Sequence, residues 1–457
     1  MGGQADVPAR AVRRARNWVE RAGYWRRWLA LGVIIGLVAG LCAIAFSEAL
    51  MLATHVLTGI LGGYQAPAPA GDGGGQGTGH FRHTWAIPAI VCLGGLAAGA
   101  LTAWLAPGAP GRGIDACVDA AHTDPRKSRG RSTMAEFAAS AITIGSGGSA
   151  GRGGPTAQLS AGFGSLLARA LDLSAEDGKI AVCVGIGSGF GAIIGAPVGG
   201  AALAGEIIYR NDFEGRALFP GFIASVMSYV IFGSVKGFTP LFGCAGADYR
   251  LEQPMQLAWF AVVGVLAGLI GLIYSTTFHG VVAVVGRIPA NRAVKPAIGG
   301  LLVGLLALVL PQVMGTGNGW IQEALDRPQL LRMPLWIILT VPLAKIAATA
   351  LSVGTGGCGD LAGPGLVTGA FLGAAVWRVL EPFATDVPHN PAPFVIVGMM
   401  ACLGSIARTP IAMMFMVAEM TGSTLILAPA IVTVGIAYFI VGCTGQTIYR
   451  SQVRTCR

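Results

Sequence analysis

One stretch of thirty residues, 257–286, contains no Asp, Glu, Lys or Arg, and it limits the fold more than any other feature of the chain. As an α-helix it would be about 45 Å long, whereas the hydrocarbon core of a bilayer is about 30 Å thick, so the helix must tilt or extend past the membrane. Five other stretches are nearly as free of charge: 29–53, 85–107, 218–233, 296–310 and 409–442. The chain is therefore predicted to be an all-α, polytopic membrane protein.

The composition agrees with this prediction and excludes other classes of protein. Glycine makes up 70 of 457 residues, about twice the usual share in soluble domains. Charged side chains make up only 12%, about half of the usual share. These values exclude an ordinary soluble enzyme. Glycine has no three-residue period, which excludes collagen, and apolar residues are abundant, at 53%, which excludes a disordered chain.

Shorter apolar segments near 134–144, 156–170 and 180–187 are broken by glycine and proline, and we expect them to be too short to cross a membrane. Backbone that is not helical is stable at membrane depth only where protein or a watery cavity surrounds it. These breaks therefore predict a pore or a transport site.

Basic residues lie at the two ends of the chain. Arginines precede the first apolar stretch and follow the last one: Arg10, Arg13, Arg14, Arg16, Arg21, Arg26, Arg27, Arg450, Arg454 and Arg457. The positive-inside rule then predicts that both termini are cytoplasmic. Residues 9–28 interleave these arginines with tryptophan and tyrosine, which is typical of a helix along the membrane surface, and nucleic-acid binding is the less favoured alternative. We expect no signal peptide and a location in the plasma or inner membrane.

Cysteine and histidine give no sign of a disulfide framework or a metal site. The nine cysteines are odd in number, scattered and never in C-x-x-C, and the six histidines form no known ligand motif. We therefore expect no metal and no disulfides.

The chain contains an internal repeat. Residues 135–155 match residues 344–364 at a constant offset of 209, with nine of 21 positions identical. A second set of matches follows at an offset of 213 and pairs Gly191, Ile193, Pro197 and Glu206 with Gly404, Ile406, Pro410 and Glu419. Interrupted helices at corresponding positions of two halves predict a binding site at the interface of the repeats, near the middle of the membrane. Helix N-termini with free N–H groups favour an anion there, and the repeat leaves parallel and inverted halves both open.

Several motifs resemble, in this order, the anion-site elements of the CLC chloride channel and transporter family. They are G-R-G-I-D at 111–115, G-R-G-G-P at 151–155, the helix at 196–206, G-x-G-G at 354–357 with Pro364, and the pair Ile448 and Tyr449. The resemblance covers nearly the whole chain from about residue 28 and is greatest to the prokaryotic branch. It implies two inverted-topology repeats with tilted and broken helices, and a homodimer with one pore in each subunit.

The resemblance also implies boundaries and a chloride site. We expect a basic segment at 1–27, membrane repeats at 28–287 and 288–449, and a short cytoplasmic tail at 450–457. The groups implied to bind chloride are the amides of Arg152, Gly153, Gly154, Leu361 and Ala362 and the hydroxyl of Tyr449. Chloride is the transported substrate, and no other cofactor is expected.

Two departures from the family pattern concern protons. The third residue of G-R-x-G-P is usually a glutamate that acts as the gate and carries protons in exchangers, but here it is Gly153. Exchangers often have a second glutamate after the helix carboxylate, and here Ile207 follows Glu206. A residue without an ionisable proton cannot transfer one, so we expect passive anion conduction. An antiporter that uses Asp360 as a substitute acid and a non-conducting scaffold are the alternatives.

Other departures leave two interpretations open. Arg112 could bind the anion or could lie at the cytoplasmic mouth and concentrate chloride there. Asp360 could be a protonatable gate or a helix N-cap. Glu206 and Glu419 could be functional, but their shared repeat position favours a structural role such as bonding to backbone amides.

Two short matches to enzyme motifs remain. Residues 147–151 fit the G-x-S-x-G nucleophile elbow, and residues 357–360 fit the core of intramembrane aspartyl proteases. The first lacks its strand and His/acid partners, and the second lacks a Tyr-Asp partner. The repeat explains both runs, so the protein is predicted not to be an enzyme.

Overall fold

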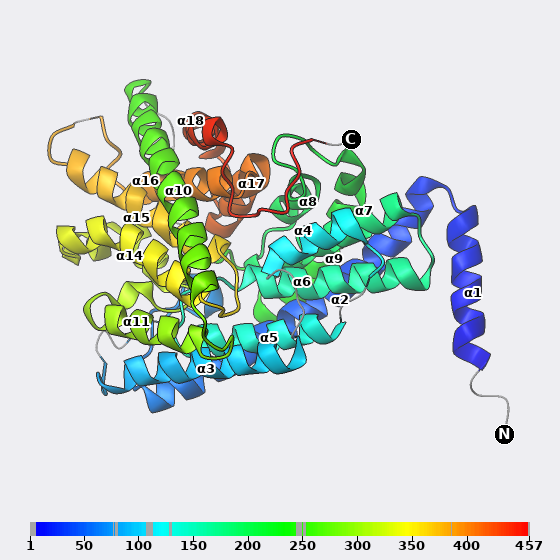
Figure 1. Ribbon diagram of the computed structural model, residues 1–457. Coiled ribbons are helices and arrows are strands. Elements are labelled where there is room, and N and C mark those ends of the chain that lie inside the picture. The colour runs from blue at the N-terminus through cyan, green and yellow to red at the C-terminus, as the bar shows by residue number, and fades with distance from the viewer. Residues whose placement is uncertain are drawn as a thin grey trace.

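The computed structural model describes residues 6–75, 77, 81–106, 113–127, 130–243, 249, 253–384 and 386–455, with side chains from residue 13 onward. These residues are helical almost throughout (Figure 1). The helices of the N-terminal part are α1 (Asp6–Arg21), α2 (Tyr24–Thr54), α3 (Ala86–Leu105), α4 (Gly113–Thr123), α5 (Gly130–Gly145), α6 (Gly153–Ala170), α7 (Ala175–Ile194), α8 (Pro197–Glu206) and α9 (Gly215–Lys236). Those of the C-terminal part are α10 (Met255–Arg287), α11 (Lys295–Val309), α12 (Asn318–Leu325), α13 (Arg327–Arg332), α14 (Leu335–Ser352), α15 (Ala362–Leu380), α16 (Ala392–Ile406), α17 (Pro410–Thr421) and α18 (Leu427–Thr444).

Eight helices within the described residues are long and apolar enough to cross a membrane, which confirms the predicted fold class. The uncharged stretch 257–286 forms most of α10. The nearly uncharged stretch 409–442 forms two helices, because Gly422 adopts a left-handed conformation (φ 62°) and ends α17 before α18 begins. One expectation about a single element was wrong. The short piece 180–187 lies within the 20-residue helix α7, whose polar first turn, capped by Ser174, conceals its length in the sequence.

Equivalent residues of the two halves pair with each other. Gly151 and Asp360 are 209 positions apart, and each donates its amide to the carbonyl of the other, at 2.7 and 3.1 Å. The bridge between them is antiparallel. A residue that pairs reciprocally with its own repeat counterpart lies on an approximate twofold axis, so the axis between the halves passes between Gly151 and Asp360.

A second reciprocal pair surrounds this axis. The amide of Ser149 donates to the Ser352 hydroxyl at 2.9 Å, and the amide of Cys358 donates to the Thr143 hydroxyl at 3.4 Å. The same offset of 209 relates the two donors to each other and the two acceptors to each other. The twofold relation therefore extends through the loops that precede α6 and α15.

Helices α8 and α17 show that the halves are inverted. Glu206, the last residue of α8, accepts hydrogen bonds from the amides of Ile411 and Ala412 in the first turn of α17, at 3.2 and 2.7 Å. Glu419, near the end of α17, accepts from two amides in the first turn of α8, at 3.0 and 2.9 Å. Each carboxylate satisfies free N–H groups at the start of the other helix. The two helices must therefore run in opposite directions.

Helix α10 packs against α14, α15, α16 and α18, and in Figure 1 it crosses the group formed by the C-terminal helices. Its partner α18 matches α9, which packs on α2 in the same way. This parallel makes α10 the counterpart of α2 in packing, while the predicted boundary between the repeats at residue 288 stays a prediction.

Helix α1 stands apart from the other helices at the edge of the molecule (Figure 1). Arg16 pairs with Glu20 of the same helix at 3.1 Å and with Asp172, in the turn after α6. Trp18 is 47% exposed. A basic helix with an exposed tryptophan fits the predicted surface position.

Candidate functional site

The loops that begin α6 and α15 meet at the twofold axis. The approach is so close that a Cβ atom on Gly151 would lie 2.8 Å from the amide nitrogen of Gly363. A Cβ atom on Gly363 would lie 2.7 Å from the Cα of Gly151. Only glycine fits at both positions. Because the loops approach so closely, the N-termini of α6 and α15, with their free amides, lie near each other at the axis.

The Asp360 side chain lies where these two helices begin. It is 3% exposed, and its Cβ faces Gly154 in the first turn of α6. Its Oδ1 accepts a hydrogen bond from the Tyr449 hydroxyl at 3.5 Å, whereas its Oδ2 has no hydrogen-bond partner among the described residues. Leu361 occupies the N-cap position of α15, so Asp360 lies one residue before the cap. The backbone amides of Leu361, Ala362 and Gly363, at the start of α15, lie beside this carboxylate.

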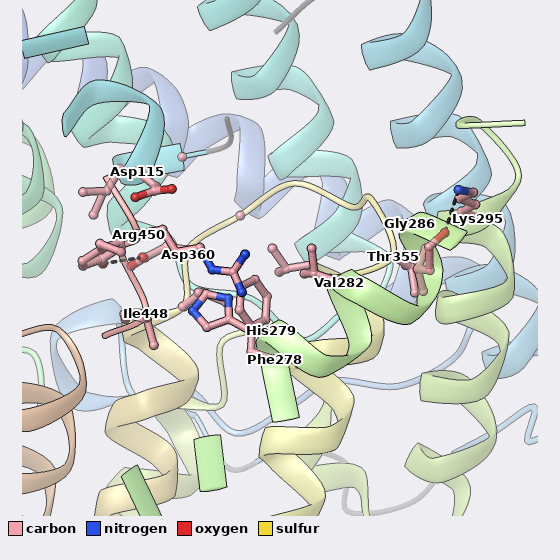
Figure 2. A pocket seen from close by; sticks show the side chains of 18 of the residues that line it. Asp115, Phe278, His279, Val282, Gly286, Lys295, Thr355, Asp360, Ile448 and Arg450 are labelled. Carbon is pink, nitrogen blue, oxygen red and sulfur yellow. Dashed lines mark hydrogen bonds between the residues drawn. The ribbon is translucent and has the colours of Figure 1, made fainter. Parts of the chain in front are cut away.

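A wide cavity of about 480 Å³ opens on one side of Asp360. Figure 2 shows it as an elongated space, with Asp115 and Arg450 toward one end and Lys295 and Thr355 at the other. Its charged and polar lining residues are Asp115, His279, Arg292, Lys295, Thr355, Asp360, Tyr449 and Arg450. The start of α15 therefore borders a cavity that is also lined by three basic side chains, those of Arg292, Lys295 and Arg450.

A second, narrow cavity of about 20 Å³ also reaches Asp360. It is lined by Gly151, Arg152, Gly153, Phe190, Ile194, Leu241, Thr316, Asn318, Asp360, Gly363, Leu366 and Met420. Among the described residues, Asp360 is the one that lines both cavities. This residue therefore separates the two spaces where they approach each other.

The Phe190 ring fills the space in front of residue 153. A Cβ atom on Gly153 would lie 2.4 Å from Cε2 of this ring. Beside it, Arg152 turns away from the helix start, and its Nη1 lies 2.7 Å from Oδ2 of Asp72 in the loop before α3. The narrow cavity is thus closed by an aromatic ring and flanked by an ion pair.

The structure brings together most residues of the predicted chloride site. The first turn of α6 holds Gly153 and Gly154, the start of α15 holds Leu361 and Ala362, and Tyr449 reaches Asp360 from the C-terminal segment. Leu361 and Tyr449 line the wide cavity, whereas Ala362 lines neither. Arg112 lies outside the described residues. Which of these groups bind chloride stays a prediction.

Sequence reasoning missed three contributors to this region: Phe190, Asp72 and Lys345. Lys345 is fully buried in α14, and its Nζ donates to the carbonyls of Val313 and Gly315 at 2.9 Å. Its repeat counterpart at the offset of 209 is Glu136, which accepts from a backbone amide at 3.2 Å. The offset itself could have identified this pair as an ammonium and a carboxylate at equivalent buried positions.

Comparison with known proteins identifies the family. Residues 94–442, more than half of the chain, match the family model described as voltage gated chloride channel. The chain belongs to this family. The CLC fold and anion transport across a membrane, both expected from the motifs, are thereby confirmed for the protein. Among the described residues, no group of three or more His, Cys, Asp or Glu side chains could hold a metal ion.

Similar proteins come from several bacteria. The chain is 27% identical over 424 residues to a ClcB-like protein of Ralstonia nicotianae, covering 91% of this chain and 94% of that one. It is 26% identical over 463 residues to the H(+)/Cl(-) exchange transporter ClcA of Salmonella arizonae, covering 97% and 90%. A solved structure of a slow cyanobacterial Cl-/H+ antiporter matches with a TM-score of 0.77 at 22% identity and covers 93% of this chain and 96% of that chain. This last match concerns the fold.

Proposed function

We propose that the protein carries chloride and similar small anions passively between the wide and the narrow cavity, with the Asp360 carboxylate as the gate. The observation that carries this proposal is that Asp360, alone among the residues that the structure describes, lines both cavities. Arg292, Lys295 and Arg450 make the wide cavity electropositive, which raises the local anion concentration.

The gate works by competition between two anions for one place. An ionised Asp360 holds a negative charge at the start of α15, where a chloride ion would use the same free amides. A transported anion must displace this carboxylate, or a proton must neutralise it. The Tyr449 hydroxyl, which now donates to Asp360, can donate to the anion once the carboxylate moves.

Transport that is not coupled to protons is favoured because residues 153 and 207 have no ionisable side chains. Gly153 has no side chain and faces Phe190, and Ile207 is a buried hydrocarbon, so neither can carry a proton. Proton-coupled exchange is the second candidate. It is favoured by the buried Oδ2 of Asp360, which has no hydrogen-bond partner in the described part of the chain and could receive a proton from either cavity.

Flux measurements on purified protein in liposomes separate these candidates. Passive conduction predicts that an outward chloride gradient collapses while the pH inside the liposomes stays constant. Proton uptake at a fixed ratio to chloride would overturn passive conduction in favour of exchange. A folded protein that moves no anion would instead be a scaffold, and the proposal would fail.

We also propose a homodimer in the plasma or inner membrane with both termini in the cytoplasm. Exposed apolar side chains on α17 and α18, including Ile411 at 45% and Ile431 at 61%, offer a surface for a second subunit. The basic lining of the wide cavity supports a cytoplasmic position for that cavity. Cross-linking in membranes tests the dimer, because a cysteine introduced at position 431 should join two chains if this surface is the subunit interface.

A further inference from the structure

We infer that Asp115 is a positioning residue that fastens the segment carrying Tyr449, and so sets where the Tyr449 hydroxyl meets the gate. Oδ1 of Asp115 accepts a hydrogen bond from the backbone amide of Ser451 at 2.9 Å, two residues after Tyr449. This inference rests on the proposed role of Asp360. It gives a use to the last residue of the G-R-G-I-D motif.

Tyr449 has no helix to hold it. Helix α18 ends at Gly445, which adopts a left-handed conformation (φ 65°), and residues 446–454, here called the C-terminal strap, form no helix or named strand. An irregular segment can shift at lower cost than a helix, because few of its backbone groups are bound within the segment. The position of the Tyr449 hydroxyl therefore depends on contacts between the strap and the rest of the protein.

Those contacts anchor the strap on both sides of Tyr449. Before it, the amide of Ile448 donates to the carbonyl of Ile406 at 3.0 Å. After it, the Gln452 side chain donates to the carbonyls of Ile207 and Ala407 at 2.9 and 3.0 Å, and the carbonyl of Val453 accepts from the amide of Arg210 at 2.8 Å. Between these anchors, two contacts tie the middle of the strap to the first half of the protein. Nη2 of Arg210 donates to the carbonyl of Arg450 at 3.2 Å, and the amide of Ser451 donates to Asp115. Of these two, the Asp115 bond joins the strap to the start of α4.

The start of α4, which carries Asp115, is itself held in place. Asp115 lies in the first turn of α4, and the amide of Gly113, at the start of that helix, donates to Oε2 of the buried Glu136 at 3.2 Å. The chain of contacts thus runs from α5 through the start of α4 to the strap and ends at the gate. Asp115 also lines the wide cavity, so its charge acts on anions there.

Asp115 is expected to act in two opposite ways: its carboxylate oxygen accepts the hydrogen bond from Ser451, and its negative charge acts on anions in the cavity. Two substitutions can separate these effects. The acceptor holds the strap, whereas the charge repels anions in the cavity. Asp115→Ala removes both, and Asp115→Asn keeps an oxygen acceptor and removes only the charge. The loss of a charge-assisted hydrogen bond changes an equilibrium by about tenfold.

The test measures chloride flux from liposomes together with hydrogen exchange of the strap. We expect Asp115→Ala to lower flux by about tenfold and to speed exchange at the Ser451 amide. Asp115→Asn should recover most of the lost flux. Asp119→Ala, which removes another aspartate from the same helix outside both cavities, is the matched control and should behave as the parent.

A double mutant distinguishes positioning from general damage. In a Tyr449→Ala background, Asp115→Ala should cause no further loss of flux, because the group that it positions is gone. Equal losses in both backgrounds would overturn the inference. Flux in Asp115→Asn as low as in Asp115→Ala would also overturn it.

Failure of the inference and failure of the proposed function give different results. If the parent moves anions and Asp115→Ala moves them equally well, the tie does not position Tyr449, while the Asp360 gate stands. If the folded parent protein moves no anion, the proposed function fails, and Asp115 then has no role in transport.

Discussion

The two loops that begin α6 and α15 have the same backbone arrangement but different side chains. Gly151 and Asp360 are equivalent by the repeat and bond to each other reciprocally across the twofold axis. At this position, however, one loop has no side chain and the other has a carboxylate. The backbones of both loops therefore bring amides to this place, and Asp360 adds a carboxylate that the equivalent Gly151 lacks. In the proposed function, this difference between equivalent positions provides the gate.

The loops also differ in what each one faces. Gly153 of the first loop faces Phe190 and the narrow cavity, whereas Leu361 of the second loop faces the wide cavity. The first loop meets a ring and the second a chamber with cations. The two loops therefore have different surroundings, although they occupy equivalent positions in the repeat.

The largest expected effect comes from adding a methyl group at the axis. Gly151→Ala places a Cβ 2.8 Å from the amide nitrogen of Gly363, so the two loops must separate. Such overpacking costs about 1–3 kcal/mol, and we expect a lower melting temperature and almost no anion flux.

The matched control is Gly280→Ala in α10, where no atom lies within 4 Å of the added Cβ. It should melt with the parent. A Gly151→Ala protein as stable and active as this control would show that the loops do not need their close approach.

The gate itself gives the next effect. Asp360→Asn removes the competing charge, so chloride flux near neutral pH should rise about tenfold or more and lose its dependence on pH. The parent should gain flux as pH falls, because protonation neutralises the same carboxylate. Chloride efflux between about pH 4.5 and 7.5 measures both.

Asp326→Asn, at an exposed aspartate before α13, is the control and should keep the pH dependence of the parent. Parallel pH profiles for the parent and Asp360→Asn would contradict the assignment of the gate.

A smaller effect tests whether the first loop can also hold a gate. Gly153→Glu alone should lower flux at every pH, because its Cβ meets the Phe190 ring. Combined with Phe190→Ala, the new carboxylate has room, and flux should become several-fold more sensitive to pH. If the double variant shows the same pH profile as Phe190→Ala alone, residue 153 does not face the anion path.

The repeat and the membrane class could be predicted from the sequence because both depend on local composition. Glycines and prolines at a constant offset fix where the helices break, and long uncharged runs fix where they span. The inverted orientation could not be predicted from the repeat alone. It depends on contacts such as those of Glu206 with the start of α17, which join positions about 200 residues apart.

The same limit applies to single site residues. Asp360 has two interpretations in the sequence because nothing local places Tyr449, which is 89 residues away, beside it. Phe190 is one apolar residue in a glycine-rich helix, and its position in front of Gly153 follows only from the packing of α7 on α6. The importance of a side chain at this site depends on tertiary contacts that leave no local pattern.

The smallest expected effect concerns the ion pair beside the narrow cavity. Asp72→Asn releases the Arg152 guanidinium, which now lies 2.7 Å from the Asp72 carboxylate, and leaves an unpaired cation next to the cavity. We expect flux to rise about twofold at low ionic strength and the gain to disappear in high salt, because exposed charges are screened. Glu176→Gln, which breaks the exposed pair with Arg216 away from both cavities, is the control. A gain that persists in high salt would mean that Asp72 acts through the shape of its loop and not through the charge of Arg152.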